Sequence, residues 1–187
     1  MNGINLRALS VIDDEEFYPS SDGQPMAETD VHVLLMMKML AMLRHCFRKK
    51  RDVYVAANIF LYYREGHPEA RTSPDVMVVK GVDGRRRRRS FKTWVEKASP
   101  CFALELTSKK TAKEDQIKKK LLYQELGVRE YFLFDPLNEY LPHQLLGYRL
   151  TRGKYEAMAL EDQGSLVSQE LGLRLIPEKG DLVLADI

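Results

Sequence analysis

The segment CFALELT, residues 101–107, constrains the fold more than any other stretch of the chain. Its nearly continuous apolar character is typical of a β-strand that is covered on both faces of a sheet. Glu105 lies inside this segment, between Leu104 and Leu106. An ionised carboxylate buried alone is very unfavourable, so Glu105 must be protonated, paired with a cation or bound to a metal ion. The strand is therefore expected to carry a polar site.

The segments that follow this strand predict a helix and more strands. Residues 112–126 form a predicted helix, for which Gly127 is a natural end. The next predicted strand, EYFLFDP, covers residues 130–136 and ends at Pro136. Shorter strand-like pieces within residues 137–187 predict a peripheral antiparallel layer.

The segments before the strand predict one helix and two further strands. Apolar residues recur at helical spacing over about residues 28–48, and Thr29 or Asp30 can cap the start of this helix. Residues 53–63 and 74–81 are rich in β-branched or other apolar residues and are predicted as strands.

The order of these elements defines a fold class. Helix, three strands, helix and strand, followed by an all-β tail, predict an α/β domain with a mixed sheet. A chain of 187 residues is long enough for one core without a disulfide or a structural metal. We therefore expect a single domain over 1–187, with an N-terminal arm (1–25), a core (26–136) and a peripheral β extension (137–187).

The distribution of charge is more informative than the net charge of +2. Acidic residues dominate near the start, at positions 13–16, and basic residues dominate the middle of the chain. The middle contains an uninterrupted arginine run and a lysine-rich segment, 109–120. A local basic surface is therefore expected, and the run is the candidate phosphate contact: Arg85, Arg86, Arg87, Arg88 and Arg89.

Cysteine usage and hydropathy favour a cytoplasmic protein with no membrane role. Cys46 and Cys101 lie far apart and lack the paired spacing of zinc sites. The longest apolar stretch, near residues 31–43, is interrupted by Lys38 and is shorter than the roughly 20 residues of a membrane span. The four histidines are scattered, and for His32 a packing or hydrogen-bonding role is expected.

Two acidic residues lie at positions that adjacent strands would bring together. Asp75 begins one predicted strand and Glu105 lies within the next, so a hairpin-like connection can place them opposite each other. Adjacent carboxylates repel, and a divalent cation such as Mg²⁺ or Mn²⁺ relieves that repulsion. On the second helix, Asp115, Lys119 and Tyr123 are spaced four apart, so Lys119 can point toward the carboxylates.

These residues belong to phrases that resemble a known family. The phrases occur in order over roughly residues 25–160 and read PMAETDVH, SPDVMVV, ALELTS and KEDQIKKKLLYQELGVREYFLFDP. In these phrases the chain resembles the Uma-type family of restriction endonucleases, within the PD-(D/E)XK nuclease superfamily.

The resemblance implies a restriction-endonuclease-like core and a magnesium-dependent site that cleaves DNA phosphodiester bonds. Asp75 matches the Asp of the PD motif, and Glu105 matches the first acid of the (D/E)XK element. The backbone carbonyl of Leu106 and the carboxylate of Glu28 match further metal ligands of such sites. Ser108 matches a family serine that supports the strand end.

The motif departs from the superfamily pattern at its lysine. Two residues after Glu105, where the lysine is expected, the chain has Thr107. In the family a D-x-x-x-K-x-x-x-Y pattern on the following helix supplies a lysine, and Asp115, Lys119 and Tyr123 reproduce it. The resemblance therefore implies that Lys119 is the displaced catalytic lysine, which positions the attacking water or stabilises the charge on phosphorus.

Simpler structural roles exist for several of these residues. Asp75 after a Ser-Pro pair can be a turn residue, and Glu105 can form a buried ion pair with Lys119 without a metal. Glu28 can favour the dipole of a helix N-terminus, and Lys119 can be a solvated helix lysine. The arginine run can be an ordinary solvated loop.

Three functions compete at this point. The first is a metal-dependent DNA endonuclease, acting as a homodimer where both strands are cut. The second is a non-catalytic nucleic-acid-binding module that keeps the nuclease fold. This alternative stays open because the chain has ELT where the superfamily has EXK. The third is an interaction domain of a mobile element or toxin-like system that acts with a partner.

Overall fold

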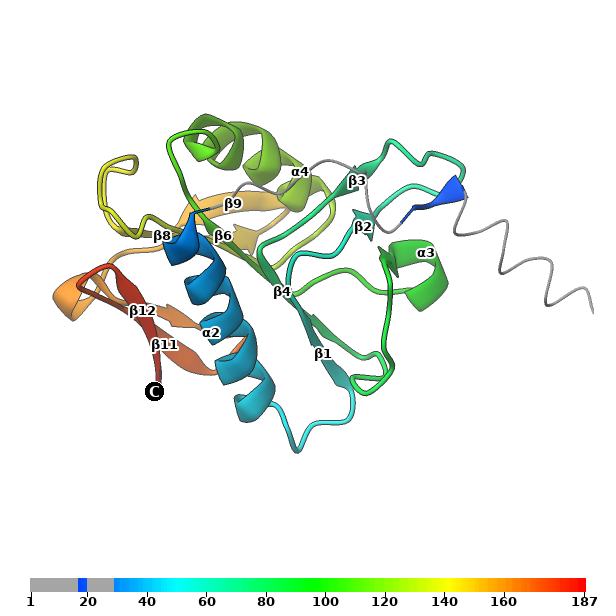
Figure 1. Cartoon of the computed structure of the whole chain (residues 1–187), viewed down its shortest axis with the longest axis horizontal. Helices are drawn as coiled ribbons and strands as arrows, with labels where there is room; N and C mark the ends of the chain where they lie inside the picture. The colour runs from blue at the N-terminus through cyan, green and yellow to red at the C-terminus, as the bar shows by residue number, and fades with distance from the viewer. Residues whose placement is uncertain (1–16, 20–28) are drawn as a thin grey trace, which may run out of the picture.

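The centre of the protein is a six-stranded mixed sheet (Figure 1). The computed structural model describes residues 17–19 and 29–187. In the sheet β6 and β7 are parallel and every other neighbouring pair is antiparallel, which confirms the predicted mixed sheet. The strands, in spatial order, are β1 (Val53–Ala56), β4 (Val76–Lys80), β6 (Phe102–Leu106), β7 (Glu130–Phe134), β8 (Leu145–Thr151) and β9 (Lys154–Ala157).

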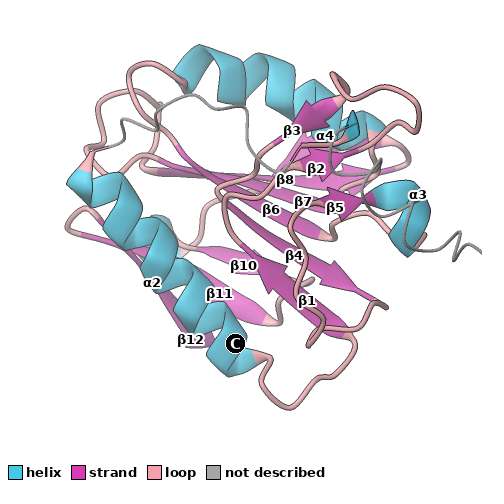
Figure 2. Ribbon diagram, turned by 45° about the vertical axis from the view of Figure 1, so that its right-hand side comes forward, coloured by secondary structure: helices cyan, strands magenta, loops and turns pink. Residues whose placement is uncertain are grey.

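Apolar residues cover both faces of this sheet, as the apolar strands predict. All five residues of β6 and of β7 are buried. Helix α2 (Asp30–Cys46) packs on one face through Met39 and Leu43, which belong to the larger apolar cluster. On the other face Tyr123 joins a second apolar cluster with Tyr131. Figure 2 shows the two helical layers on either side of the strands.

The start of α2 has the predicted capping residue, whereas its end differs from the prediction. Thr29 is the N-cap, and its side chain accepts a hydrogen bond from the backbone N–H of His32 at 3.3 Å. The predicted helix over about 28–48 is therefore two residues longer at its C-terminal end than α2, because the chain leaves the helical conformation near Phe47.

The second predicted helix, 112–126, is two helical segments of different winding. Glu114–Lys119 (η1) is a π-helix, and Lys120–Glu125 (α4) is an α-helix. Segments of π-helix are rare in proteins, and those that occur are often found at functional sites. Asp115 is buried although it lies on the first turn of η1. This segment therefore points a charged residue into the protein.

Residues 53–63 do not form the single strand that was predicted. β1 ends at Ala56, and Asn58 has a positive φ of 49°, which an extended strand cannot contain. The chain resumes as β2 (Leu61–Tyr62), which lies between β3 (Arg71–Thr72) and β5 (Phe91–Lys92) in a small separate sheet. The short helix α3 (Thr93–Glu96) follows β5.

The C-terminal part differs in part from the predicted peripheral layer. β8 and β9 extend the central sheet, because β8 pairs with β7 from Glu130 to Phe134 and so covers its backbone edge. A separate antiparallel sheet contains β10 (Leu166–Ser168), β11 (Leu173–Glu178) and β12 (Asp181–Asp186), after the short 3₁₀ turn η2 (Asp162–Gly164).

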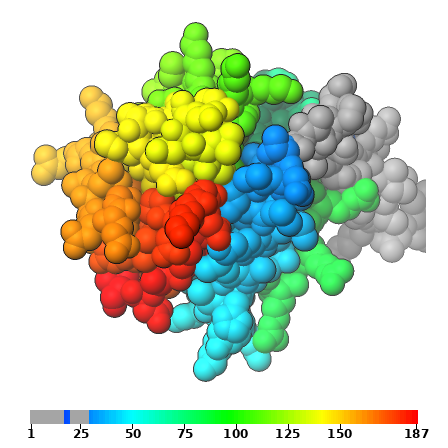
Figure 3. Space-filling model, turned by 60° about the vertical axis from the view of Figure 1, so that its left-hand side comes forward, coloured from blue at the N-terminus to red at the C-terminus, as the bar shows by residue number. Residues whose placement is uncertain are grey.

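The C-terminal sheet packs beside α2. Leu175 and Leu182 belong to the same apolar cluster as Met39 of α2. Figure 3 shows the red end of the chain directly against the blue helix on one face of the molecule. Within the described part of the chain, no helix combines the length and the apolarity that a membrane span requires.

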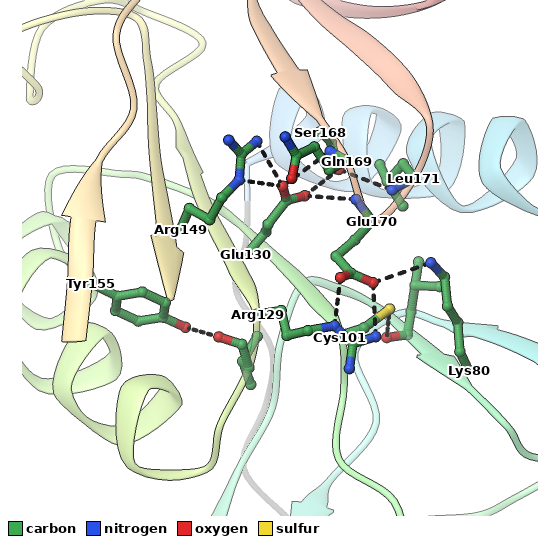
Figure 4. A network of polar contacts seen from close by, with 12 residues as sticks. Lys80, Cys101, Arg129, Glu130, Arg149, Tyr155, Ser168, Gln169, Glu170 and Leu171 are labelled. Carbon is green, nitrogen blue, oxygen red and sulfur yellow. Dashed lines mark hydrogen bonds and ion pairs between the residues drawn. The ribbon is translucent and has the colours of Figure 1, made fainter. Parts of the chain in front are cut away.

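A buried carboxylate joins the two sheets (Figure 4). Glu130, at the start of β7, is 1% exposed and accepts hydrogen bonds from Arg149 at 3.0 and 3.1 Å. The hydroxyl of Ser168 also donates to it, as do the backbone N–H groups of Gln169 at 3.0 Å and Glu170 at 3.2 Å. Glu130 thereby provides the hydrogen-bond acceptor for the donors in the turn between β10 and β11.

We expect Glu130→Ala to lower the free energy of unfolding by about 3 kcal/mol, because it removes the carboxylate partner of Arg149 and leaves the buried Ser168 hydroxyl and two backbone N–H groups without their acceptor. Urea denaturation measures this loss. The control is Glu156→Ala on the exposed surface of β9, for which a change within about 0.5 kcal/mol is expected. Equal losses in both variants would contradict the role of Glu130.

Candidate functional site

The structure brings Asp75 and Glu105 together at one end of the central sheet. β4 and β6 are antiparallel neighbours, with Val76 opposite Leu104. Continuing this register by one residue places Asp75 opposite Glu105. The Asp75 carboxylate lies at the end of the ladder and accepts a hydrogen bond from the backbone N–H of Leu106 at 2.7 Å. The two acids are therefore neighbours.

A histidine from α2 completes the surroundings of Asp75. His32 Nε2 lies 3.2 Å from Asp75 Oδ1, and each of these two side chains is 13% exposed. The N-cap Thr29 fixes the first turn of α2, where His32 lies. From the sequence a packing or hydrogen-bonding role was expected for His32, but its place beside Asp75 could not be predicted, because it depends on the docking of α2 against β4. A histidine one turn from the acidic ETD phrase was the available signal.

Glu105 is held by two residues of the predicted D-x-x-x-K-x-x-x-Y pattern. Lys119 Nζ lies 2.8 Å from Glu105 Oε2, and the hydroxyl of Tyr123 donates to Glu105 Oε1 at 2.7 Å. Lys119 Nζ is also 3.2 Å from Asp115 Oδ1. Glu105 and Asp115 are each 1% exposed, whereas the Lys119 side chain is 19% exposed. The pairing of Glu105 with a cation is thus present in the structure.

Burial and charge shift the protonation equilibria of this cluster. Burial raises the pKa of Glu105 to about 8, although the neighbouring Lys119 acts in the opposite direction, and Asp75 and Asp115 add to the rise. Burial lowers the pKa of Lys119, but Glu105 and Asp115 outweigh this effect and raise it. Burial also raises the pKa of Asp115. One ammonium group therefore faces three carboxyl groups.

This arrangement fits a divalent cation in its donor type and charge. The carboxylates of Asp75 and Glu105 are the hard oxygen ligands that Mg²⁺ and Mn²⁺ prefer, and the surplus of acid leaves charge for a cation to neutralise. Among residues 17–19 and 29–187, however, no three His, Cys, Asp or Glu side chains are already arranged around a common metal position. Glu28 lies outside the described residues.

Protein groups lie against all four carboxylate oxygens of the acid pair. Asp75 contacts His32 and the N–H of Leu106, and Glu105 contacts Lys119 and Tyr123. A metal ion bound to both acids would therefore replace or share at least one of these contacts. Lys119 and His32 are the members whose side chains can turn toward solvent, because both are partly exposed.

A groove of about 400 Å³ lies next to the cluster, between the N-terminus of α2 and the loop after β6. Its lining includes His32, Thr107, Lys109 and Lys110. Thr107 is 3% exposed, and its hydroxyl has no hydrogen-bond partner among the described residues. The Ser108 hydroxyl oxygen lies 3.2 Å from that of Thr111, and this hydrogen bond stabilises the turn after β6. The groove leads from solvent to the imidazole beside Asp75.

The arginine run lies at the other end of the strands. It follows Lys80, the last residue of β4, and β4 spans roughly 17 Å at about 3.4 Å per residue. Arg88 is an internal anchor, because its side chain is 3% exposed and donates to Glu96 at 2.8 and 2.9 Å. Arg85, Arg86, Arg87 and Arg89 are exposed. The structure therefore does not bring the run to the acids.

Two substitutions at the cluster should shift the pKa of Glu105 in opposite directions. We expect Asp115→Asn to lower it from about 8, because a like charge is lost, and Lys119→Met to raise it, because the paired cation is lost. Titration of the ¹³C-labelled glutamate carboxyl groups by NMR measures both shifts. A common shift in one direction would contradict the described contacts. Circular dichroism confirms that each variant is folded.

Comparison with known proteins adds a family and a related fold. A family model described as "Uma2: Putative restriction endonuclease" matches residues 8–177. The chain is also similar to a solved structure described as "a putative nuclease belonging to DUF820 from Anabaena variabilis ATCC 29413". That likeness has 15% sequence identity, covers 81% of each chain and has a TM-score of 0.55, so it bears on the fold alone. No protein with a curated description matches the chain.

Proposed function

Since the chain belongs to the Uma2 family of restriction endonucleases, we propose that it hydrolyses DNA phosphodiester bonds at the acid pair Asp75 and Glu105. The observation that carries the proposal is the convergence of these two acids with Lys119 at the end of adjacent strands. Two carboxylates can hold the metal ion of a metal-assisted phosphodiester hydrolysis, and a lysine can stabilise the charge that develops on the phosphate. The fold of the related solved structure is consistent with this proposal.

In this proposal Asp75 and Glu105 hold Mg²⁺ or Mn²⁺, with the carbonyl of Leu106 and the carboxylate of Glu28 as further ligands. When bound, the ion would polarise the scissile phosphate and lower the pKa of the attacking water. The N–H of Leu106 fixes one oxygen of Asp75, so the other oxygen is the one directed to the ligand. His32, beside that second oxygen, can accept or donate a proton there.

Lys119 is the proposed catalytic cation. Asp115 and Glu105 hold its ammonium group and keep it charged. With a cation held by Glu105, Lys119 would lose part of that attraction, and its ammonium group could contact the phosphate oxygens or the attacking water. Tyr123 is fully buried and donates to Glu105, so it would hold the carboxylate in place.

One observation favours the second candidate function, a nucleic-acid-binding module without catalysis. The four carboxylate oxygens of Asp75 and Glu105 all have protein partners. The acid pair thus has protein contacts without a metal, so it can serve as a purely structural ion-pair cluster. Cleavage and metal binding separate the two functions.

The first test is cleavage of supercoiled plasmid and of single-stranded DNA with Mg²⁺ or Mn²⁺. We expect Asp75→Ala and Glu105→Ala to abolish cleavage, and Lys119→Ala to lower its rate by about 100-fold or more. The matched control is Lys118→Ala, which removes the same charge from an exposed neighbouring position and should retain the activity. DNA binding by a wild-type protein that never cuts would instead support the binding module.

The second test is the pH dependence of Mn²⁺ binding, followed by electron paramagnetic resonance. A proton on Glu105 competes with the metal, so affinity should rise with pH up to about 8, the raised pKa of Glu105. In Asp115→Asn, where that pKa is expected to be lower, the rise should end at a lower pH. Asp75→Asn should weaken binding at every pH. Unchanged binding in Asp75→Asn would exclude the proposed ligand set.

A further inference from the structure

A basic groove runs along β1, the edge strand of the central sheet, and the arginine run contributes the part of it that lies farthest from the acids. This groove of about 480 Å³ runs between the C-terminal end of α2, strand β1 and the loop after β4. We call it the arginine groove. Its basic lining residues are Arg44, Arg48, Lys50, Arg85, Arg86, Arg87 and Arg88.

The arginine groove has a strong positive charge although the whole chain has a net charge of only +2. Among the described residues that line it, none is acidic. Arg88 is neutralised by Glu96, and Arg86 lies 3.7 Å from the same carboxylate. Arg44 donates to the backbone carbonyl of Val55 at 3.2 Å, which fixes its guanidinium group without neutralising it.

The loop that presents the arginines is attached to the edge of the sheet. The backbone N–H of Gly81 donates to the backbone carbonyl of Asp52 at 2.8 Å, and that of Gly84 donates to the backbone carbonyl of Arg51 at 2.8 Å. A Cβ at Gly84 would lie 2.1 Å from the carbonyl oxygen of Val53, so this close approach requires glycine. Arg88 closes the loop, with its guanidinium group 4.3 Å from the Tyr54 ring centroid.

The chemistry of the lining suits anions with two acceptor oxygens, such as phosphate groups. Apart from the neutralised Arg88, five of the six basic residues are arginines. The planar guanidinium group donates two parallel hydrogen bonds to phosphate, which a lysine ammonium group cannot do. A row of such groups along a groove fits the repeating phosphates of a nucleic acid strand.

The separation of the two sites fits one nucleic acid molecule. His32 and Arg44 lie on the same helix, twelve residues apart, which is roughly 18 Å at 1.5 Å per residue. Phosphates of one strand follow each other at about 3.4 Å along the duplex axis, so this separation corresponds to about five nucleotides.

We propose that the arginine groove is a second, non-catalytic site that binds the phosphate backbone of duplex DNA. It increases the affinity for long substrates and does not read their sequence, because its donors are suited to phosphates. The proposal rests on the proposed function only in the choice of DNA as the ligand. The groove acts on binding, and the acid pair acts on bond cleavage.

The test compares DNA binding by the full chain and two triple variants with equal loss of charge. The groove variant is Arg85→Gln, Arg86→Gln and Arg87→Gln, which leaves the anchor Arg88 intact. The control variant replaces exposed basic residues elsewhere: Arg152→Gln, Lys154→Gln and Lys179→Gln. Fluorescence anisotropy with a labelled DNA duplex, in EDTA and over a series of KCl concentrations, gives the affinity and its salt dependence.

We expect the groove variant to bind duplex DNA about tenfold more weakly or worse, with a salt slope smaller by about 3. The control variant should bind nearly as wild type. Equal affinities and slopes in the groove variant and the wild type would overturn the proposal, as would an equal loss in the control variant. Groove-dependent binding of phosphatidylserine vesicles without binding of DNA would also overturn it, in favour of a membrane surface.

Hydrolysis of the small phosphodiester bis(4-nitrophenyl) phosphate distinguishes this proposal from the proposed function. The groove variant should hydrolyse it at the wild-type rate, because the small substrate does not reach the groove. Asp75→Ala should not hydrolyse it. If the wild type hydrolyses neither this compound nor DNA, the proposed function fails, and the anisotropy result still decides the role of the groove.

Discussion

The burial of the Glu105 carboxylate between two apolar layers is the constraint on which the rest of the site depends. β6 is covered on both faces, so a charge within it must be compensated by neighbours. Tyr123 and Lys119 supply that compensation from the following helix. Lys119 in turn keeps its charge despite its burial because the carboxylates of Glu105 and Asp115 raise its pKa. The cluster is thus a mutually dependent set, and removal of one member changes the protonation of the others.

Helix α2 connects the acid cluster with the arginine groove. Its first turn brings His32 to Asp75, and its last turn carries Arg44 to the edge of β1. The apolar contacts of Met39 and Leu43 between them hold the helix on the sheet. A shift of α2 along its axis would therefore move both the imidazole and the guanidinium group. The proposed cleavage site and the proposed backbone-binding groove therefore share one helix as their support.

The sequence was sufficient for the parts of the fold that depend on local pattern. The buried strands β4, β6 and β7 were predictable because apolar runs of this length fit a sheet covered on both faces. The break at Asn58 was not, because its positive φ depends on how β1 and β2 enter different sheets. The buried ion pair between Arg88 and Glu96 could not be predicted either, since Glu96 lies on a helix of only four residues. His32 required the tertiary position of α2.

The π-helical winding of η1 explains how a lysine from the following helix can replace one on the strand. Thr107, two residues after Glu105, lies on the same side of β6, where a lysine would reach the carboxylate directly. In a regular α-helix each four-residue step rotates a side chain about 40° past the previous one, so Asp115, Lys119 and Tyr123 would diverge. A π-turn has more residues per turn, and a four-residue step within it falls short of a full turn. The short step from Asp115 to Lys119 therefore offsets the long step from Lys119 to Tyr123. All three side chains can then face the buried strand, as their contacts require.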